Sequence, residues 1–572
     1  MTSTLFRGGR IYSAAVPGAT ALLMRGGRIA WLGADDEAPA ADEVIELEGA
    51  LVTPAFVDAH VHATDTGITL AGLDLSATRS ALEVLDAVAA FTAGLASDAV
   101  VLGHGWDEST WVSQVPPSAG ELDRAGGGRM VYLSQASIHS AVCSSALLAA
   151  GEPEVSASPG HDASGWLRRD AHHVVRGIAF RSITPAQRRA AQTVTLRRAA
   201  SLGIAAVHEC GGPGTSDETD FTGLLAHSGT SHVLPEVYGY WGELLAAAKA
   251  KELGAFGAGG DLYADGALGA RTAHLREPYV DSPTSTHGHG YITAEQVGEH
   301  LIDCTRHGMQ GGFHAIGDQA IATVLAGFRL AAAAVGLDDL RTGRHRIEHV
   351  EIADKAIIAG LVEFGIVASV QPAFDRLWGG EHQMYASRLG PERSLAANPV
   401  GAMHGVGVAL AFGSDSPVTP LDPWGTVRAA MWHFNPMYRM NARAAFAAHT
   451  RGGWRAVHLD DGVLAPGAAA TLAVWSTPVG LDPSGLPALD PLAPLPTCRR
   501  TVLRGTFIFD EVDQRDTSDE VDQRDNFDEV DQRNNFDAVD QRNNFDEDDH
   551  HLGGADQRKT VDEEGRETQP SP

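Results

Sequence analysis

The chain has 572 residues, more than one ordinary hydrophobic core accommodates, so we expect one large domain with additional segments. Apolar residues make up 44% of the chain and charged residues 20%, as is typical of soluble globular proteins. Half of the formal net charge of −30 comes from residues 510–572, which hold 22 acidic and 7 basic residues. The mild charge of the remaining chain argues against nucleic-acid binding.

The cysteine pattern and the apolar runs indicate the compartment. Cys143, Cys210, Cys304 and Cys498 are far apart and form no C-x-x-C pair, which favours a reducing, cytoplasmic setting over a disulfide framework or a zinc knuckle. The N-terminal sequence "MTSTLFRGGRIYSAAV" lacks the continuous apolar segment of a signal peptide. No continuous run of about 18 apolar residues occurs, so we expect no membrane span.

The two ends of the folded region have a similar sequence pattern. Residues 1–53 contain short strand-like pieces separated by glycine turns, such as "TLFRGGRIYS" and "ALLMRGGRIAWLG". Residues 451–509 return to that pattern in "GVLAPGAAATLAVWS" and "CRRTVLRGTFIF". Because isolated hairpins are only marginally stable, we expect both ends to form one small composite β domain.

Residues 54–450 alternate β-rich runs with Ala- and Leu-rich helical stretches, which favours an α/β fold with a parallel sheet. Ten runs are strand-like, two more than a (β/α)₈ barrel requires. Two of them fall within residues 66–189, and treating that segment as an insertion after the first barrel strand leaves eight. The ten runs are residues 54–58, 98–103, 129–134, 204–208, 233–239, 261–265, 309–314, 346–350, 366–371 and 408–415.

The C-terminal tail, residues 510–572, has a nine-residue period that begins with "DEVDQRDTS" and "DEVDQRDNF". Nonapeptide repeats can form calcium-binding β-helices, but these require glycines at fixed positions, and the first four copies contain none. Each copy offers at most three apolar residues. We therefore expect a disordered polar extension.

Polar side chains follow several of the predicted barrel strands. His60 and His62 end the run in "PAFVDAHVH", and His314, His349 and Asp415 close three later runs. Residues i and i+2 of a strand share one face, so His60 and His62 can point together into the mouth of a barrel. An H-x-H pair alone is more often a surface feature, but these five residues together favour a zinc-type metal site at the strand ends.

Six ordered motifs resemble the amidohydrolase superfamily, in its branch similar to YtcJ and to N-substituted formamide deformylase. They are "FVDAHVH", "HGWDES", "YADGALGARTA", "GGFHAIGDQAI", "RIEHVE" and "FGSDSPV", and the resemblance covers residues 1–508. It implies a metal-bearing (β/α)₈ barrel, a composite β domain and hydrolysis at a carbonyl carbon, usually of a C–N bond. His60, His62, His314, His349 and Asp415 match the metal-site positions of that family.

One position departs from the family pattern. Relatives often carry a lysine four residues before the aspartate of the "ADG" motif, where a carboxylated lysine can bridge two metals. This chain has Asp261 there, a shorter carboxylate, and Asp265 and Glu209 are alternative bridging groups at neighbouring strand ends. The cofactor is thus expected to be one or two Zn²⁺, or another divalent metal.

Four further residues are candidates for substrate binding. Trp106, Asp107 and His139 match family motifs within the insertion and would wall the pocket, unless the insertion is an ordinary fold of its own. Arg271 in "GALGARTA" would hold a substrate carboxylate or carbonyl, or form a structural salt bridge.

The expected enzyme is a metal-dependent hydrolase of a non-peptide amide or formamide. Asp415 would shuttle the proton, and His349 or His139 would help to stabilise the oxyanion. Deamination, ester or lactone opening and decarboxylation on the same barrel are alternatives, as is a non-catalytic binding module. The expected partners are a small-molecule substrate and, in a homodimer, a second copy of the chain, but neither nucleic acid nor membrane.

The tail should be dispensable, because its repeats carry too little apolar surface to offset the entropy of ordering them. Deleting residues 511–572 should leave the thermal midpoint within about 1–2 °C and turnover unchanged, as measured by differential scanning fluorimetry and activity assay. A clear loss of either property would mean that the repeats pack on the rest of the protein.

Overall fold

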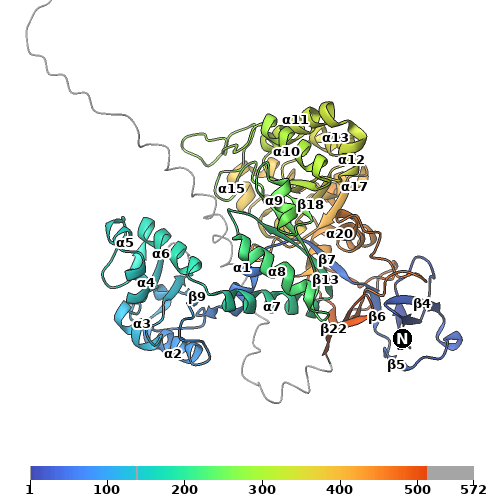
Figure 1. Ribbon diagram of the computed structural model, residues 1–572, viewed down its shortest axis with the longest axis horizontal. Coiled ribbons are helices and arrows are strands. Elements are labelled where there is room, and N and C mark those ends of the chain that lie inside the picture. The colour runs from blue at the N-terminus through green and yellow to red at the C-terminus, as the bar shows by residue number, and fades with distance from the viewer. Residues whose placement is uncertain (1, 137–139, 512–572) are drawn as a thin grey trace, which may run out of the picture.

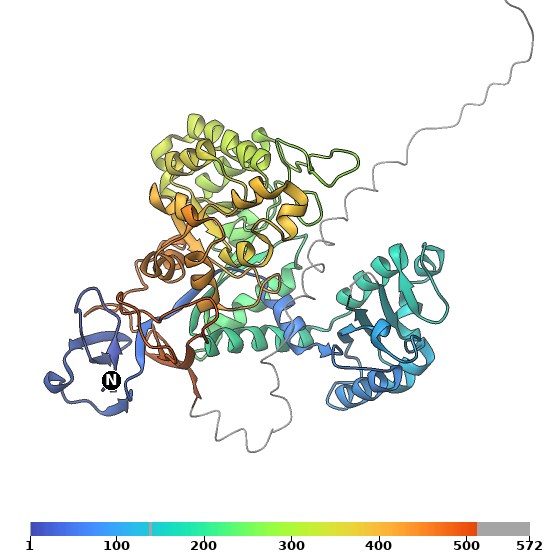
Figure 2. The same cartoon turned by 180° about the vertical axis from the view of Figure 1, so that it is seen from behind.

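The computed structural model describes residues 2–136 and 140–511, so the expected extension beyond residue 511 and the candidate His139 lie outside the described residues. A barrel occupies the centre of the molecule (Figure 1). The insertion projects from one side of the barrel, and the N-terminal β strands lie on the opposite side, as the reverse view also shows (Figure 2).

Eight parallel strands form the barrel and confirm the predicted fold class. The first strand, β7, lies beside the last, β19, because the Asp415 amide donates to the His60 carbonyl at 2.8 Å and Val61 bridges Ser416. The C-terminal ends of parallel strands meet at one edge, which places the predicted ligands together. The strands are β7 (Phe56–Val61), β13 (Ile204–Gly211), β14 (Glu236–Trp241), β15 (Gly257–Ala258), β16 (Gln310–Ala315), β17 (Arg346–His349), β18 (Val367–Val370) and β19 (Ala409–Phe412).

The fourth barrel strand differs from the sequence-based expectation. It is the two-residue strand β15, whereas residues 261–265 run outside the ladder, with Tyr263 making one isolated bridge to His314. Gly259 and Gly260 end the strand with φ values of +153° and +76°. A Cβ atom on Gly259 would lie 2.2 Å from the Gly312 nitrogen, so only glycine permits this close crossing.

Helices cover the outside of the barrel. α10 and α11 pack against each other, and α11 also packs on α13. By length and composition α11 could cross a membrane, but Ile321, Val324, Leu325 and Phe328 are buried in the core. The helices after the insertion are α7 (Pro185–Ser201), α8 (Glu218–Thr230), α9 (Ala247–Glu252), α10 (Ala294–His307), α11 (Asp318–Val335), α12 (Leu337–Thr342), α13 (Lys355–Phe364), α14 (Pro372–Trp378), α15 (Met384–Leu389), α16 (Pro391–Leu395), α17 (Val400–Gly405), α18 (Pro423–Met431), α19 (Ala442–Ala448) and α20 (Arg451–Ala456).

Strands from the two ends of the folded region pair with each other, as the sequence predicts. β6 (Leu51–Pro54) runs antiparallel to β20 (Leu472–Ser476), and β21 (Thr497–Leu503) and β22 (Thr506–Asp510) extend the same sheet. Two boundaries differ from expectation, because α20 packs on barrel strands and Asp510 ends β22. The remaining N-terminal strands are β1 (Ser3–Arg7), β2 (Arg10–Ile11), β3 (Ala21–Arg25), β4 (Arg28–Gly33) and β5 (Glu43–Glu46).

The insertion is a small α/β unit with hydrophobic clusters of its own. It is shorter than the expected 66–189, because α1 (Ala63–Ala71) packs along α7 beside the barrel. The crossing is tight, since a Cβ atom on Gly67 would lie 1.9 Å from the Ala191 carbonyl oxygen. The elements of the insertion are β8 (Leu73–Asp74), α2 (Ala81–Thr92), β9 (Val101–Trp106), α3 (Ala119–Ala125), β10 (Val131–Gln135), β11 (Ser140–Cys143), α4 (Ser145–Ala150), α5 (Glu154–Ala157), β12 (Trp166–Arg168) and α6 (Arg169–Arg181).

Phe56 packs the first barrel strand against two barrel helices and against the sheet formed by the two ends of the folded region. Its ring is fully buried and makes edge contacts with Trp424, Phe446 and Trp475, with ring centroids 4.9 to 5.7 Å apart. Trp424 and Phe446 lie on barrel helices, and Trp475 lies on β20. The first barrel strand is thus anchored by an aromatic cluster below the mouth of the barrel.

Phe56→Ala should lower the free energy of unfolding by about 3–5 kcal/mol, because it leaves a cavity among three aromatic rings. Chemical denaturation followed by tryptophan fluorescence measures this loss. Leu82→Ala, at a site whose residue is 67% exposed, is the control and should change stability by no more than about 0.5 kcal/mol. Equal effects of the two substitutions would contradict this role for Phe56.

Candidate metal centre

The mouth of the barrel brings together all six predicted metal ligands. They come from five different strands or from the loops that follow them, and all six are buried. The ligands are His60 and His62 from the end of β7, Asp261 from the loop after β15, His314 from β16, His349 from β17 and Asp415 from the segment after β19.

Asp261 lies at the centre of the histidines. Its Oδ2 atom is 3.2 Å from His62 Nε2, and its Oδ1 atom is 3.4 Å from His314 Nδ1. The same Oδ1 lies 3.6 Å from His60 Nε2 and 3.7 Å from His349 Nε2. Of the three carboxylates considered from the sequence, Asp261 is thus the one that faces the four imidazoles.

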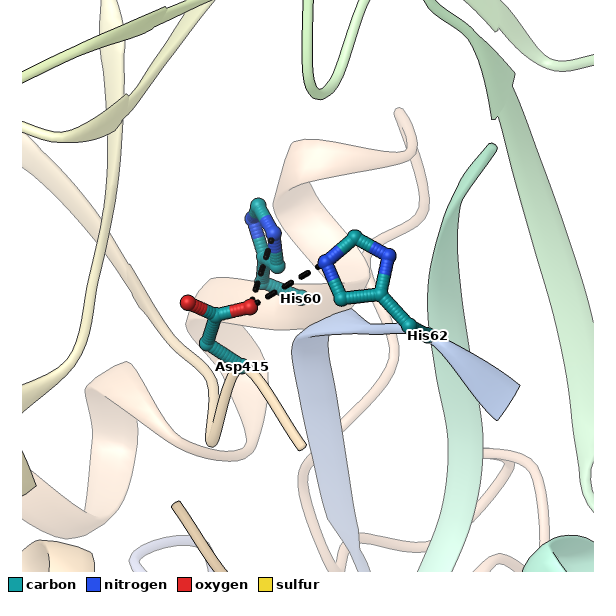
Figure 3. A group of neighbouring side chains, drawn as sticks. All are labelled: His60, His62 and Asp415. Carbon is teal, nitrogen blue, oxygen red and sulfur yellow. Dashed lines mark ion pairs between the residues drawn. The ribbon is translucent and has the colours of Figure 1, made fainter. Parts of the chain in front are cut away.

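Asp415 lies on another side of the same group. Its Oδ1 atom is 3.4 Å from His60 Nε2 and 3.2 Å from His62 Nε2 (Figure 3). His60 therefore points its Nε2 atom at two carboxylates at once. Asp261 and Asp415 share these two histidines. The site is therefore continuous across the seam of the barrel, where its first strand, β7, meets its last, β19.

Left-handed backbone conformations direct the side chains of two predicted ligands, His349 and Asp415, into the site. His349 has φ +71° and Asp415 has φ +56°, left-handed values that are uncommon for residues other than glycine. Regular strand geometry would turn His349 away from the face that Glu348 occupies. The left-handed turn at the end of β17 instead brings both side chains inside the barrel, a local strain of the kind found at functional sites.

The donor set fits a divalent cation. His60 Nε2, Asp261 Oδ1, His314 Nδ1 and Asp415 Oδ1 are buried without a hydrogen-bond partner among the described residues. Two ligands bound about 2.0–2.1 Å from a tetrahedral cation lie about 3.3 Å apart, close to the separations found here. His60, His62 and Asp415 form one ligand group, and His60, Asp261 and His349 form a second.

Electrostatics keep the carboxylates ionised. Burial raises the pKa of Asp261, but the neighbouring histidines, His60 foremost, outweigh burial and hold this pKa well below its usual range. The pKa of Asp415 is also lowered, because His60 and His62 outweigh the effect of burial. Both groups therefore carry the negative charge that a cation requires near neutral pH.

The two alternative carboxylates accept backbone amides, and Asp265 Oδ1 also lies 3.9 Å from His314 Nε2. Asp265 accepts backbone N–H groups from His274, Ile316 and Gly317, at 2.8 to 3.0 Å. Glu209 accepts the Ala63 amide at 2.7 Å and so satisfies the first turn of α1.

The described substrate-binding candidates lie away from the centre. Trp106 is buried in the insertion, where its Nε1 donates to the Leu133 carbonyl, and Asp107 caps a short 3₁₀ helix. Arg271 forms a two-point ion pair with Asp281, at 3.0 and 2.8 Å, which is the structural alternative considered from the sequence. None of these three lines the cavity beside the metal ligands.

That cavity has a volume of about 340 Å³ and opens directly onto the ligand cluster. Apolar side chains form most of the wall beyond the ligands, Glu351 and Arg388 add charged groups, and Thr215, Tyr263 and Tyr385 add hydroxyl groups. The Glu351 carboxylate accepts a short hydrogen bond from the Tyr385 hydroxyl. The principal apolar residues are Leu268, Ile316, Phe374, Trp378, Met384 and Val418.

Sequence reasoning missed two buried residues beside the ligands, Arg346 and Glu348. They lie in the motif "RIEHVE", in which His349 alone was assigned a role. Two charged residues at alternate positions of a buried strand are a recognisable signal, because charges are almost never fully buried unless they are paired.

Comparison with known proteins gives a consistent result. The sequence profile of the amidohydrolase family matches residues 43–509. The putative amidohydrolase YtcJ of Bacillus subtilis is 27% identical over 505 residues, which cover 82% of this chain and 91% of that protein. N-substituted formamide deformylase of Arthrobacter pascens is 32% identical over 136 residues, or 23% of this chain and 25% of that protein. An uncharacterized metal-dependent hydrolase from Pyrococcus furiosus superposes with a TM-score of 0.69 at 25% identity, covering 82% of this chain and 98% of that one.

Asp261→Asn should weaken metal binding by more than about 10-fold, because it removes the charge at the centre of four imidazoles. Elemental analysis and titration with a chelator measure this loss. Asp422→Asn is the control: it neutralises a carboxylate that caps α18 by accepting the Gly425 amide at 2.9 Å, away from the ligand histidines, and it should retain the metal. Retention of full metal content by the Asp261 variant would remove this residue from the ligand set.

Proposed function

Because the chain belongs to the amidohydrolase family, we propose that it is a metal-dependent hydrolase that cleaves a non-peptide C–N bond, in an amide or a formamide. The observation that carries this proposal is the convergence of buried, unpaired ligand atoms beside a mostly apolar cavity. The partial match to a formamide deformylase supports the choice of bond.

One or two Zn²⁺, or another divalent ion, would be held by the ligand cluster at the barrel mouth. When bound, such an ion polarises a carbonyl group and lowers the pKa of a water molecule toward about 7. The residues that would hold it are His60, His62, His314, His349, Asp261 and Asp415.

Asp415 is the proposed proton shuttle. It is ionised, lines the cavity and lies beside the two histidines of β7. It therefore accepts a proton from the attacking water and passes it to the leaving nitrogen as the C–N bond breaks. One water molecule is consumed, and the products are a carboxylic acid and an amine.

His349 serves as a ligand in this proposal. Its Nδ1 atom pairs with Gln371 Oε1 at 2.9 Å, so only Nε2 faces the site. A ring whose Nδ1 donates its proton in this way presents a lone pair at Nε2, which suits a metal and leaves no N–H for an oxyanion. Stabilisation of the oxyanion then falls to the bound cation.

The apolar wall positions the substrate. Phe374 stacks parallel to the His349 ring, with centroids 6.1 Å apart, and Trp378 contacts Phe374 at 4.7 Å. These rings form a surface next to the ligands on which an uncharged substituent can rest. They also exclude water from the reacting carbonyl, which strengthens every electrostatic interaction in the site.

The cysteines agree with a cytoplasmic location, which we also propose. All four are buried and unpaired. Free thiols persist in a reducing compartment, where disulfides are rare.

Asp415→Asn should reduce turnover by about 10²–10⁴-fold, because the amide cannot accept the proton. The assay is a panel of formamides, amides, lactones and esters, with the variant measured on the best substrate. Asp460→Asn, at a residue whose side chain is 83% exposed, is the control and should retain turnover. Near-normal turnover of the Asp415 variant would assign the proton to another group, and preferential ester or lactone hydrolysis would replace the proposed bond class.

A further inference from the structure

We propose that Glu348, held by Arg346, is the positioning residue for His60 and that this pair sets the metal affinity of the centre. The inference rests on the proposed function, because it requires His60 to be a metal ligand. It adds two residues that do not line the cavity.

The first step is the contact between Glu348 and His60. His60 Nδ1 lies 2.9 Å from Glu348 Oε2, and both side chains are fully buried. Donation from Nδ1 to a carboxylate fixes one tautomer of the imidazole, with the lone pair on Nε2. That Nε2 atom has no hydrogen-bond partner among the described residues and points at Asp261 and Asp415. Glu348 thus determines which nitrogen of His60 faces the cation.

The second step is the anchoring of Glu348. Arg346 Nε donates to Oε1 at 2.5 Å, and Arg346 Nη2 donates to Oε2 at 2.8 Å. The pairing keeps the carboxylate charged in a fully buried position, where an isolated charge would be costly.

Arg346 is itself fixed from several strands. Its Nη2 atom also donates to the Ala59 carbonyl at 2.6 Å and lies 2.8 Å from Ser369 Oγ, while its guanidinium stacks on Tyr240 at 4.3 Å. These residues belong to β7, β18 and β14. The guanidinium therefore cannot move without disturbing three strands, so it provides a rigid support for the His60 ring.

A second histidine in the same centre supplies an internal comparison. His349 Nδ1 makes a contact of the same length, 2.9 Å, but its acceptor is the neutral amide oxygen of Gln371. A charged acceptor raises the basicity of an imidazole more than a neutral one does, and so strengthens its bond to a metal. We therefore expect His60 to depend on its acceptor more strongly than His349 does.

An alternative use of the same atoms is a metal site of its own. Ligand atoms of His60, Cys210 and Glu348 lie within 4.8 Å of one another. Arg346 occupies both oxygens of Glu348, so a cation there would lie against a guanidinium and would have to displace it. That repulsion favours the positioning role over a separate metal site.

The test compares metal affinities by chelator competition with Zn²⁺ and records the thermal midpoint of the metal-free chain. Glu348→Gln keeps the shape and a hydrogen-bond acceptor but removes the charge, and should weaken binding by about 10–100-fold. Asp220→Asn is the matched control, since it neutralises another buried carboxylate, which accepts hydrogen bonds from Thr64 and Gln192 and does not line the cavity, and it should weaken binding by less than about threefold. Gln371→Leu should have a smaller effect than Glu348→Gln.

Loss of the carboxylate also leaves Arg346 without its partner, so a fold defect must be separated from a metal defect. The double variant Arg346→Met/Glu348→Gln removes the unpaired cation and should regain most of the thermal midpoint while binding Zn²⁺ as weakly as the single variant. Native affinity in Glu348→Gln, or recovery of affinity with stability in the double variant, would overturn the inference. His60→Ala separates the two proposals: if it also retains Zn²⁺, the ligand assignment fails, and if it alone loses Zn²⁺, only the role of Glu348 fails.

Discussion

Hydrogen bonds across one seam of the barrel make the rest of the site possible. Asp58 Oδ1 accepts the amides of His60 and Ser414, at 3.2 and 2.9 Å, and the Asp415 amide donates to the His60 carbonyl. Residues more than three hundred positions apart in the sequence thereby become neighbours. His60 and His62, at the end of β7, face Asp415 because the first and last strands are joined at this level and not one residue higher or lower.

The cluster above the seam is arranged at a cost to the folded chain. Several of its nitrogen and oxygen atoms are buried without hydrogen-bond partners in the part of the chain that the structure describes, and two of its residues have left-handed backbone conformations. Each of these features costs free energy unless something compensates for it. A cation would compensate for the unpaired atoms. Without one, the ligand cluster lowers the stability of the folded chain, whereas the surrounding apolar core raises it.

The sequence predicted the barrel, and the convergence of the candidate metal ligands at its mouth, because both depend on simple periodicities. Apolar runs that end in histidine or aspartate mark the mouth of a parallel barrel, and His60, His62 and Asp415 follow that rule. β15 could not be placed in the same way, since its two residues are followed by glycines that cross Gly312 at close range. Glu348 was missed because strand alternation allows only one of two adjacent residues to face inward, and the left-handed turn at His349 breaks that alternation. For Arg271 the sequence left a substrate contact and a structural salt bridge open, since the position of its partner Asp281 is set by the path of a long loop.

The position of the insertion has a consequence for how the chain folds. It separates β7 from β13, two strands that pair side by side, by 142 residues along the chain. Closing so long a loop is entropically unfavourable, and non-local pairings of this kind slow folding. The insertion has hydrophobic clusters of its own, so it can become compact before the barrel does and draw the ends of α1 and α7 together. No described side chain of the insertion lines the cavity. The insertion would instead aid folding, because its early compaction shortens the loop that must close before β7 and β13 can pair.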